Sequence, residues 1–215
     1  MSAALPHPAQ PALDRLAEAR FVPVVRASSD AKALKAARAF LAGGCRALEI
    51  ALTVPGAAEV IRTLAAEGHY VGAGTVLDAE SAREVIAAGA RYLVGPTTEP
   101  EVIDVAREAA VLVVPGALTP NEVLAAHRAG AQVIKVFPVS SLGGPRYLRL
   151  LNDPFPHLRF FASGGVSLDD AKDYLAAGAV ALGIGGALVN PARVEAEDTA
   201  WLEAEARRWC EALHT

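Results

Sequence analysis

The chain has 215 residues, of which 53% are hydrophobic and 20% are charged, and its net charge is −4. This composition is typical of a folded globule with a large apolar core and excludes a disordered chain. The slight acidity and the lack of a basic run argue against binding to nucleic acid or to an anionic membrane surface. No apolar run approaches the roughly 18 residues that a membrane span requires.

The N-terminus and the cysteines indicate a cellular compartment. Residues 1–20 lack the basic-then-apolar order of a secretory signal, and Cys45 and Cys210 lie far apart in sequence without forming a CxxC pair. We therefore expect a cytoplasmic protein with reduced cysteines. The five histidines are scattered and none has metal-ligand spacing, so we expect neither a metal nor another cofactor.

Short apolar runs recur at intervals of roughly 18 to 26 residues, and Gly-, Pro- or Thr-rich turns follow most of them. Residues 1–20 precede the first run, and we expect them to form an N-terminal helical extension that covers one end of the fold. The eight runs predicted to be strands are residues 21–26, 46–51, 70–74, 91–95, 111–115, 132–137, 158–163 and 179–184.

Alanine-rich segments with helical spacing lie between these runs. Thr98 with Glu101 and Thr119 with Glu122 have the spacing of a capping box, and Pro120 would occupy a first helical position. Near-continuous apolar strands alternating with helices imply a parallel sheet that is covered on its outer side. Eight such units favour a single-domain (β/α)8 barrel, or TIM barrel, over residues 21–215. A doubly wound open sheet is the alternative, but the regular count of eight argues against it.

Two charges lie well inside predicted strands, Lys135 in QVIKVFP and Glu49 in LEIALT. In a (β/α)8 barrel the chemistry lies at the C-terminal ends of the strands. A buried, unpaired ammonium group is costly, so Lys135 either extends outward, pairs structurally with Glu49, or serves chemistry. Their matching depth favours chemistry. A lysine whose pKa is lowered by burial could attack a ketone and form a Schiff base while Glu49 moves protons.

Paired glycines follow the last two predicted strands. Gly164 and Gly165 in ASGGVS, and Gly185 and Gly186 in GIGGALV, stand where barrels of this class commonly bind phosphate through backbone N–H groups. Tight turns alone would also explain them. Arg26, at the end of the first strand, could clamp a carboxylate or a phosphate. Ser163 is equally consistent with a local contact and with a contact to substrate.

Together these residues resemble the family of 2-keto-3-deoxy-6-phosphogluconate (KDPG) and 4-hydroxy-2-oxoglutarate aldolases, over about residues 15 to 190. The motifs that carry the resemblance are PVVRASS, GGCRALEIALTVPGAAEVI, VGAGTVLD, LVGPTTEPEV, VPGALTPNEV, IKVFPVSSLGG, ASGGVS and GIGGALV. The resemblance implies a metal-free class I aldolase, usually a homotrimer, that cleaves a small phosphorylated keto acid to pyruvate and glyceraldehyde 3-phosphate.

Carried across by motif, the resemblance implies that Lys135 forms the Schiff base and that Glu49 is the general acid and base. The residues implied in binding the pyruvate part are Arg26, Thr53, Thr75, Pro96 and Phe137. Those implied in binding phosphate are Ser163, Gly164, Gly165, Gly185 and Gly186.

The chain departs from the family pattern at two positions. Many members have an arginine where this chain has Thr53, so Arg26 is expected to bind the pyruvate carboxylate instead. Some members have a serine where this chain has Ala187, so phosphate binding would rely more on backbone amides. The hydroxyl of Ser163 resembles the gluconate-type enzymes, but the galactonate epimer and 4-hydroxy-2-oxoglutarate stay open as substrates.

Two other functions stay open from the sequence. One is a phosphate-binding isomerase or synthase on the same barrel, in which Lys135 is only an electrostatic clamp. The other is a non-catalytic barrel that serves as a trimeric building block.

Overall fold

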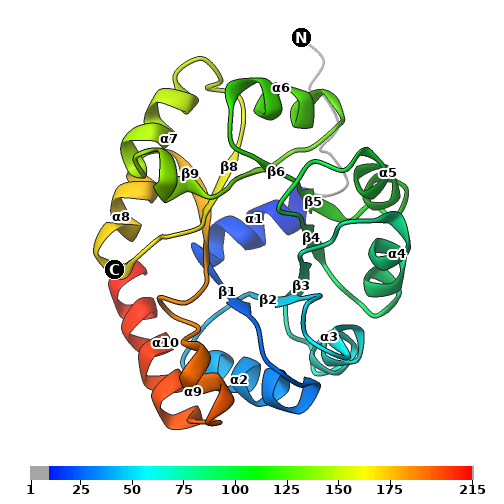
Figure 1. The fold of residues 1–215 in the computed structure, drawn as a ribbon, viewed down its shortest axis with the longest axis vertical. Coiled ribbons are helices and arrows are strands. Elements are labelled where there is room, and N and C mark those ends of the chain that lie inside the picture. Colours follow the sequence, from blue (N-terminus) through cyan, green and yellow to red (C-terminus); the bar gives the residue numbers. More distant parts are fainter. Residues whose placement is uncertain (1–9, 215) are drawn as a thin grey trace.

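The computed structural model describes residues 10–214, in which parallel strands form a ring surrounded by helices (Figure 1). The spatial order of the strands is β5-β4-β3-β2-β1-β9-β8-β7-β6. Their bounds are β1 Phe21–Val25, β2 Leu48–Ala51, β3 Val71–Gly74, β4 Tyr92–Val94, β5 Leu112–Val114, β6 Gly116–Ala117, β7 Ile134–Val136, β8 Phe160–Ser163 and β9 Ala179–Ile184.

The predicted fifth strand is divided into β5 and β6 at Pro115, which explains why nine strands are found where eight were predicted. Proline has no N–H group to donate to a sheet ladder, so a strand breaks there. Strand β5 pairs with β4 and strand β6 pairs with β7, and the Pro115 carbonyl accepts the backbone N–H of Lys135 at 2.8 Å. The divided strand thus closes the ring. The predicted (β/α)8 barrel is confirmed, and the open-sheet alternative is wrong.

Helices follow the strands in alternation and cover the outside of the barrel (Figure 1). Their bounds are α1 Gln10–Ala19, α2 Asp30–Ala42, α3 Ala57–Ala66, α4 Ala79–Ala87, α5 Pro100–Glu108, α6 Pro120–Arg128, α7 Pro145–Asn152, α8 Leu168–Ala176, α9 Pro191–Glu195 and α10 Thr199–Leu213, with a 3-10 turn over Val139–Leu142. Among residues 10–214, none of these helices has both the length and the apolar character to cross a membrane.

The helix starts test the predicted caps. Helix α6 begins at Pro120 with the capping box of Thr119 and Glu122 in place, as predicted. The predicted capping box of Thr98 and Glu101 is wrong. Glu99 is the N-cap of α5, because the Thr98 hydroxyl instead donates to the carbonyl of Gly116 at 2.9 Å.

Alternate residues along each strand belong to two separate apolar clusters. Ile134 and Val136 of β7 pack outward against the helices, whereas Val133 and Phe161 face the interior of the barrel. The interior cluster consists of Leu16, Ala19, Val22, Ala47, Tyr70, Tyr92, Val94, Leu112, Val114, Val133, Phe161 and Ala181. Since side chains alternate along a strand, Lys135 and Glu49 share the inward direction of these residues.

Helix α1 lies across the N-terminal end of the barrel, at the centre of the view in Figure 1. Leu16 and Ala19 of this helix join the interior cluster, and the Tyr70 hydroxyl donates to the Ala12 carbonyl at 2.8 Å. Of the predicted extension, residues 1–9 lie outside the described part of the chain. The division into an extension and a barrel stays a prediction.

Candidate active site

Lys135 and Glu49 face each other from opposite walls of the barrel. Lys135 lies on β7 and Glu49 lies on β2. In one direction around the ring these two strands are separated by β1, β9 and β8. In the other direction they are separated by β3, β4 and the divided strand β5 and β6. The exposed fraction is 7% for Lys135 and 1% for Glu49. Both charged groups are therefore withdrawn from water, and the outward-extending interpretation of Lys135 is wrong.

The Glu49 carboxylate is buried against the glycines of β3. A Cβ atom on Gly74 would lie 2.0 Å from Glu49 Oε1, so the absence of a side chain there provides the room for the carboxylate. Glu49 Oε2 is buried and has no hydrogen-bond partner among the described residues. Burial raises the pKa of Glu49, an effect that the positive charges of Lys135 and Arg26 oppose.

The Lys135 ammonium is held by packing rather than by a paired charge. Its Nζ lies 4.9 Å from the centre of the Phe137 ring, and no ion pair joins it to Glu49 or to another described carboxylate. Burial lowers the pKa of Lys135; Glu49 raises it, and Arg26 lowers it further. The pair is thus close enough to interact electrostatically without forming a direct salt bridge, which argues against the structural ion pair considered above.

Arg26 follows β1 directly and gathers two of the predicted site residues. Its guanidinium donates from Nη1 to Thr53 Oγ1 at 2.8 Å and from Nη2 to Thr75 Oγ1 at 3.2 Å. Thr75 has a φ of 62°, a left-handed conformation that strains a β-branched residue. Such strain is concentrated at functional sites, and here it places the Thr75 hydroxyl next to the arginine.

A cavity of about 580 Å³ opens at the C-terminal ends of the strands, above Lys135. Its lining consists of Val24, Arg26, Thr75, Pro96, Lys135, Phe137, Ser163, Gly164, Gly165, Val166, Ser167, Gly185, Gly186 and Ala187. Ten of the twelve predicted site residues are brought together here. Glu49 and Thr53 do not line the cavity, although Glu49 interacts with Lys135 and Thr53 holds Arg26.

The glycine loops form one end of this cavity. Gly165 has a φ of 84°, and a Cβ atom there would lie 2.0 Å from Ser140 Oγ, so this position requires glycine. At Gly185 and Gly186 a Cβ atom would meet nothing within 4 Å. Their backbone is therefore open toward the cavity rather than shaped by close packing. The Ser163 hydroxyl donates to the carbonyl of Gly183 on the neighbouring strand β9 at 2.9 Å.

Sequence reasoning missed part of the lining. Val24 and Val166 are apolar wall residues without a polar signal. Ser167 was detectable only as the start of a helix, and it is the N-cap of α8, with its N–H and hydroxyl both donating to Asp170 Oδ1. Gly74 is part of the motif VGAGTVLD, but its closeness to Glu49 depends on the pairing of two strands.

A (β/α)8 barrel with a buried lysine and a buried carboxylate on opposite walls, beneath a cavity at its C-terminal end, is an enzyme scaffold of the class I aldolase type. The family model described as KDPG and KHG aldolase matches residues 13–204. The chain belongs to this family, whose members are carbon–carbon lyases.

Relatives and solved structures agree with this assignment. A 2-dehydro-3-deoxy-phosphogluconate aldolase of Pseudomonas aeruginosa is 38% identical over 88% of this chain and 87% of its own. A Rhizobium meliloti protein named "Probable 2-dehydro-3-deoxy-6-phosphogalactonate aldolase" is 38% identical over 71% of this chain and 74% of its own. A crystal structure of a 4-hydroxy-2-oxoglutarate/2-dehydro-3-deoxyphosphogluconate aldolase has a TM-score of 0.80 at 33% identity and covers 94% of this chain and 98% of that one.

One further similar structure is a porous protein cage designed by fusing symmetric oligomeric domains. Its TM-score is 0.81 at 27% identity, with 91% of this chain and 72% of that chain covered.

Proposed function

We propose that the chain cleaves KDPG to pyruvate and glyceraldehyde 3-phosphate through a Schiff base on Lys135. The observation that carries the proposal is the burial of Lys135 at the floor of the cavity, without a direct ionic partner among the described residues. Burial lowers the pKa of this lysine, so that more of the amine is free near neutral pH.

The reaction balances with this residue set and water. The Lys135 amine attacks the C2 ketone to give a carbinolamine, which loses water to form an iminium ion. Loss of the proton of the C4 hydroxyl breaks the C3–C4 bond, releasing the aldehyde and leaving the bonding electrons in an enamine. Protonation of the enamine at C3 and hydrolysis of the imine release pyruvate and restore the amine.

The position of Glu49 near Lys135 supports a role for this carboxyl in the reaction steps that take place next to the lysine. Glu49 interacts electrostatically with Lys135 but does not line the cavity, so it is suited to proton transfers at C2 and C3 rather than at C4. The C4 hydroxyl proton would then leave through water. Since burial raises the pKa of Glu49, the carboxyl can hold and release a proton closer to neutral pH than a solvated one.

The two charged ends of the substrate, its carboxylate and its phosphate, would bind in different parts of the cavity. Arg26, fixed by Thr53 and Thr75, would bind the pyruvate carboxylate, while Pro96 and Phe137 form apolar walls. The phosphate would lie at the glycine loops and the start of α8, where backbone N–H groups favour an anion. Ala187 lines this end without a hydroxyl, so backbone donors would carry most of the phosphate binding.

The experiment is a pyruvate-release assay with KDPG, its galactonate epimer, the unphosphorylated keto acid and 4-hydroxy-2-oxoglutarate. It is run on the wild type and on Lys135→Ala, with Lys172→Ala as a surface lysine control. Borohydride in the presence of pyruvate should fix the three-carbon unit on Lys135 in the wild type. Undiminished turnover in Lys135→Ala, or pyruvate release without trapping in the wild type, would exclude this mechanism. Neither pyruvate release nor trapping in the wild type would favour the isomerase or synthase alternative.

We also propose a cytoplasmic homotrimer. Leu77, Leu142 and Leu150 are large apolar side chains that are 48%, 46% and 56% exposed. A largely apolar cavity of about 710 Å³, which shares Pro96 and Phe137 with the active-site cavity, offers a surface that a second copy could cover. Light scattering coupled to size exclusion should give three times the 22.3 kDa chain mass.

A further inference from the structure

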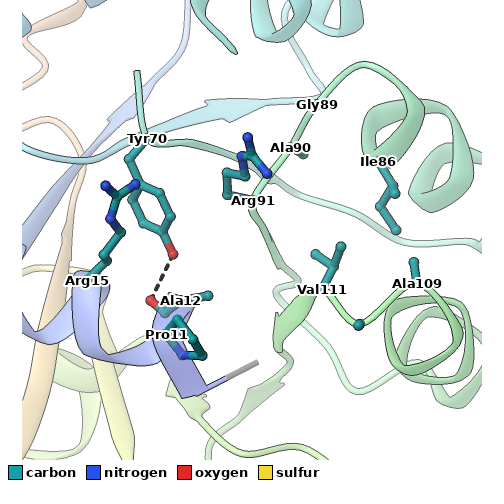
Figure 2. A pocket seen from close by; sticks show the side chains of 11 residues that line it. Pro11, Ala12, Arg15, Tyr70, Ile86, Gly89, Ala90, Arg91, Ala109 and Val111 are labelled. Carbon is teal, nitrogen blue, oxygen red and sulfur yellow. Dashed lines mark hydrogen bonds between the residues drawn. The ribbon is translucent and has the colours of Figure 1, made fainter. Parts of the chain in front are cut away.

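A second cavity of about 580 Å³ lies at the N-terminal end of the barrel, opposite to the active site. It is open to solvent and is bordered by helix α1 and by the segments that lead into β3, β4 and β5 (Figure 2). The lining residues are Pro11, Ala12, Arg15, Tyr70, Ile86, Gly89, Ala90, Arg91, Ala109, Ala110 and Val111. This cavity takes no part in the chemistry proposed above.

Its charged lining is entirely positive. Arg15 and Arg91 are the two charged residues of the lining, and neither forms an ion pair with another described residue. The Arg15 guanidinium lies 5.5 Å from the centre of the Tyr70 ring. Burial raises the pKa of Tyr70, while the charges of Arg15 and Arg91 lower it, so both guanidinium groups act on the same phenol. Two guanidinium groups therefore lie close to the Tyr70 hydroxyl in the wall of the cavity.

The walls of the cavity are fixed by local contacts. The Tyr70 hydroxyl donates to the Ala12 carbonyl, which holds α1 against the segment before β3 (Figure 2). Ala110 follows α5 in a left-handed conformation with a φ of 55°, at the position where α4 and α6 have Gly89 and Gly130. Alanine is strained there, and it adds a methyl group to the lining.

A simpler role for the arginines would be to neutralise the C-terminal ends of α4 and α5, which point toward this end of the barrel. That role predicts hydrogen bonds from guanidinium groups to the last helical carbonyls. Within residues 10–214, neither Arg15 nor Arg91 makes such a bond. Their donors are therefore available to a ligand. Asp14 on α1, Glu84 on α4 and Glu108 on α5 are the nearest acids in sequence to the lining, and none of them lines it.

We propose that this cavity binds a small organic anion, with its phosphate or carboxylate group at Arg15 and Arg91 and its apolar part against Ile86 and Val111. Arginine is suited to both anions because its planar donors form bidentate, charge-assisted hydrogen bonds. Because both arginines are exposed to solvent, we expect weak binding with a Kd of about 1 mM, which is roughly 4 kcal/mol.

The test is a ligand titration monitored by the chemical shifts of the backbone amides. The residues whose shifts change show whether a ligand binds in this cavity or in the active site. The probes are inorganic phosphate for the phosphate arm, and acetate and benzoate for the carboxylate arm. We expect saturable shifts at residues 89–91 and 109–111. In Arg15→Gln and in Arg91→Gln the Kd at these residues should rise about tenfold, which is the loss of one charge-assisted contact.

Two comparisons make the result decisive. Arg46→Gln removes an arginine from the neighbouring cavity at the same end of the barrel and should leave the Kd unchanged. Amide shift changes that phosphate causes at residues 164–167 and 185–187 report binding in the active site. They should persist in Arg15→Gln, Arg91→Gln and Arg46→Gln. The proposal is overturned if no probe gives saturable shifts at residues 89–91, or if Arg15→Gln and Arg91→Gln bind as the wild type does. Benzoate binding without phosphate binding would assign the cavity to carboxylates.

Discussion

Gly74 and Glu49 lie so close together on neighbouring strands that a Cβ atom on Gly74 would be 2.0 Å from Glu49 Oε1. The register of β2 and β3 places Gly74 beside Ala51 and Gly72 beside Glu49, so the carboxylate leans toward the C-terminal end of β3. A glycine thus determines where the proposed general acid and base can reside.

Gly74→Ala should displace the carboxylate and lower kcat by at least tenfold, because proton transfer by a positioned group contributes about 10²–10⁴ to the rate. The matched control is Gly72→Ala, two residues earlier on the same face. A Cβ atom there would lie 2.4 Å from the Tyr92 ring, so this change should lower the melting temperature with a smaller effect on kcat. Equal kcat losses in both variants, once corrected for folded protein, would show that displacement of the Glu49 carboxylate is not the cause of the loss in Gly74→Ala.

The pH dependence of turnover should be governed on its acid side by Lys135, since the free amine is the reactive form. The positive charge of Arg26 lowers the pKa of Lys135. Replacing it in Arg26→Met should raise that pKa and move the acid limb of the kcat/KM profile to higher pH. The KM for the keto acid should also rise, by about tenfold, if the guanidinium binds the carboxylate.

Arg46→Met, at the other end of the barrel, is the control for the pH profile. It should leave both the acid limb and the KM where they are in the wild type. An acid limb that stays fixed in Arg26→Met would mean that another group governs it.

The loop that carries Arg26 is fastened to α9 by one carboxylate. Glu195 Oε1 accepts the backbone N–H of Ser28 at 2.9 Å, and Oε2 accepts the Ser28 hydroxyl at 2.6 Å and Lys32 Nζ at 2.8 Å. Glu195→Gln should raise KM about two- to fivefold with little change in kcat, a range that matches the loss of an exposed ion pair. Glu197→Gln, which breaks the neighbouring ion pair with Lys35, should leave KM unchanged.

The same contact predicts a response to acid. Hydrogen bonds from Lys32 and Ser28 lower the pKa of Glu195 to about 2. A lowered carboxyl pKa stabilises the folded state above the unfolded pKa of about 4.5, and the stabilisation is lost as the pH falls toward 2. Acid unfolding of the wild type and Glu195→Gln should therefore converge below pH 4.5. Parallel curves down to pH 2 would show that the carboxylate contributes nothing to acid stability.

The buried lysine and glutamate should cost stability. Replacing a buried pair of charges by neutral groups of similar size is often stabilising by about 1–4 kcal/mol. The double variant Lys135→Met with Glu49→Gln should therefore unfold at a higher denaturant concentration than the wild type at pH 7, while it is inactive. An equal or lower midpoint would mean that the pair stabilises the fold.

The difference in stability between the double variant and the wild type should become smaller as the pH rises. Burial lowers the pKa of Lys135 in the folded state below its usual 10.5, so the penalty is full at pH values below the folded pKa. It fades as the pH rises through the folded pKa and is gone above 10.5, where the amine is neutral in both states. The lysine contribution to the gap between variant and wild type should shrink over that window.

The sequence predicted the barrel and most of the site because both depend on local patterns. Lys135 and Glu49 stand out as single charges in apolar strands, and strand periodicity decides which way they point. Thr53 and Arg26 were linked through a family substitution pattern, and a direct hydrogen bond joins them. The roles assigned to these residues in catalysis stay predictions.

Contacts between distant segments were not predictable in the same way. Nothing near Glu195 in the sequence points to Ser28, and the two meet only because the first and last strands are neighbours in the ring. The separation of Cys45 and Cys210 in sequence was equally uninformative, because the two thiols lie close enough in the fold for Cys210 to raise the pKa of Cys45. Thr98 was misassigned as a cap because its partner, the Gly116 carbonyl, lies on another segment.

The division of the fifth strand at Pro115 has a consequence for how the molecule behaves in a crowded solution. Because the Pro115 carbonyl takes the Lys135 N–H and β5 and β6 continue the ladders on either side, the described ring leaves no strand with a free row of amides and carbonyls. Intermolecular strand addition, a common first step toward fibrils, has no template on such a surface. The proline that interrupts one strand therefore coexists with a fold protected against self-templated aggregation.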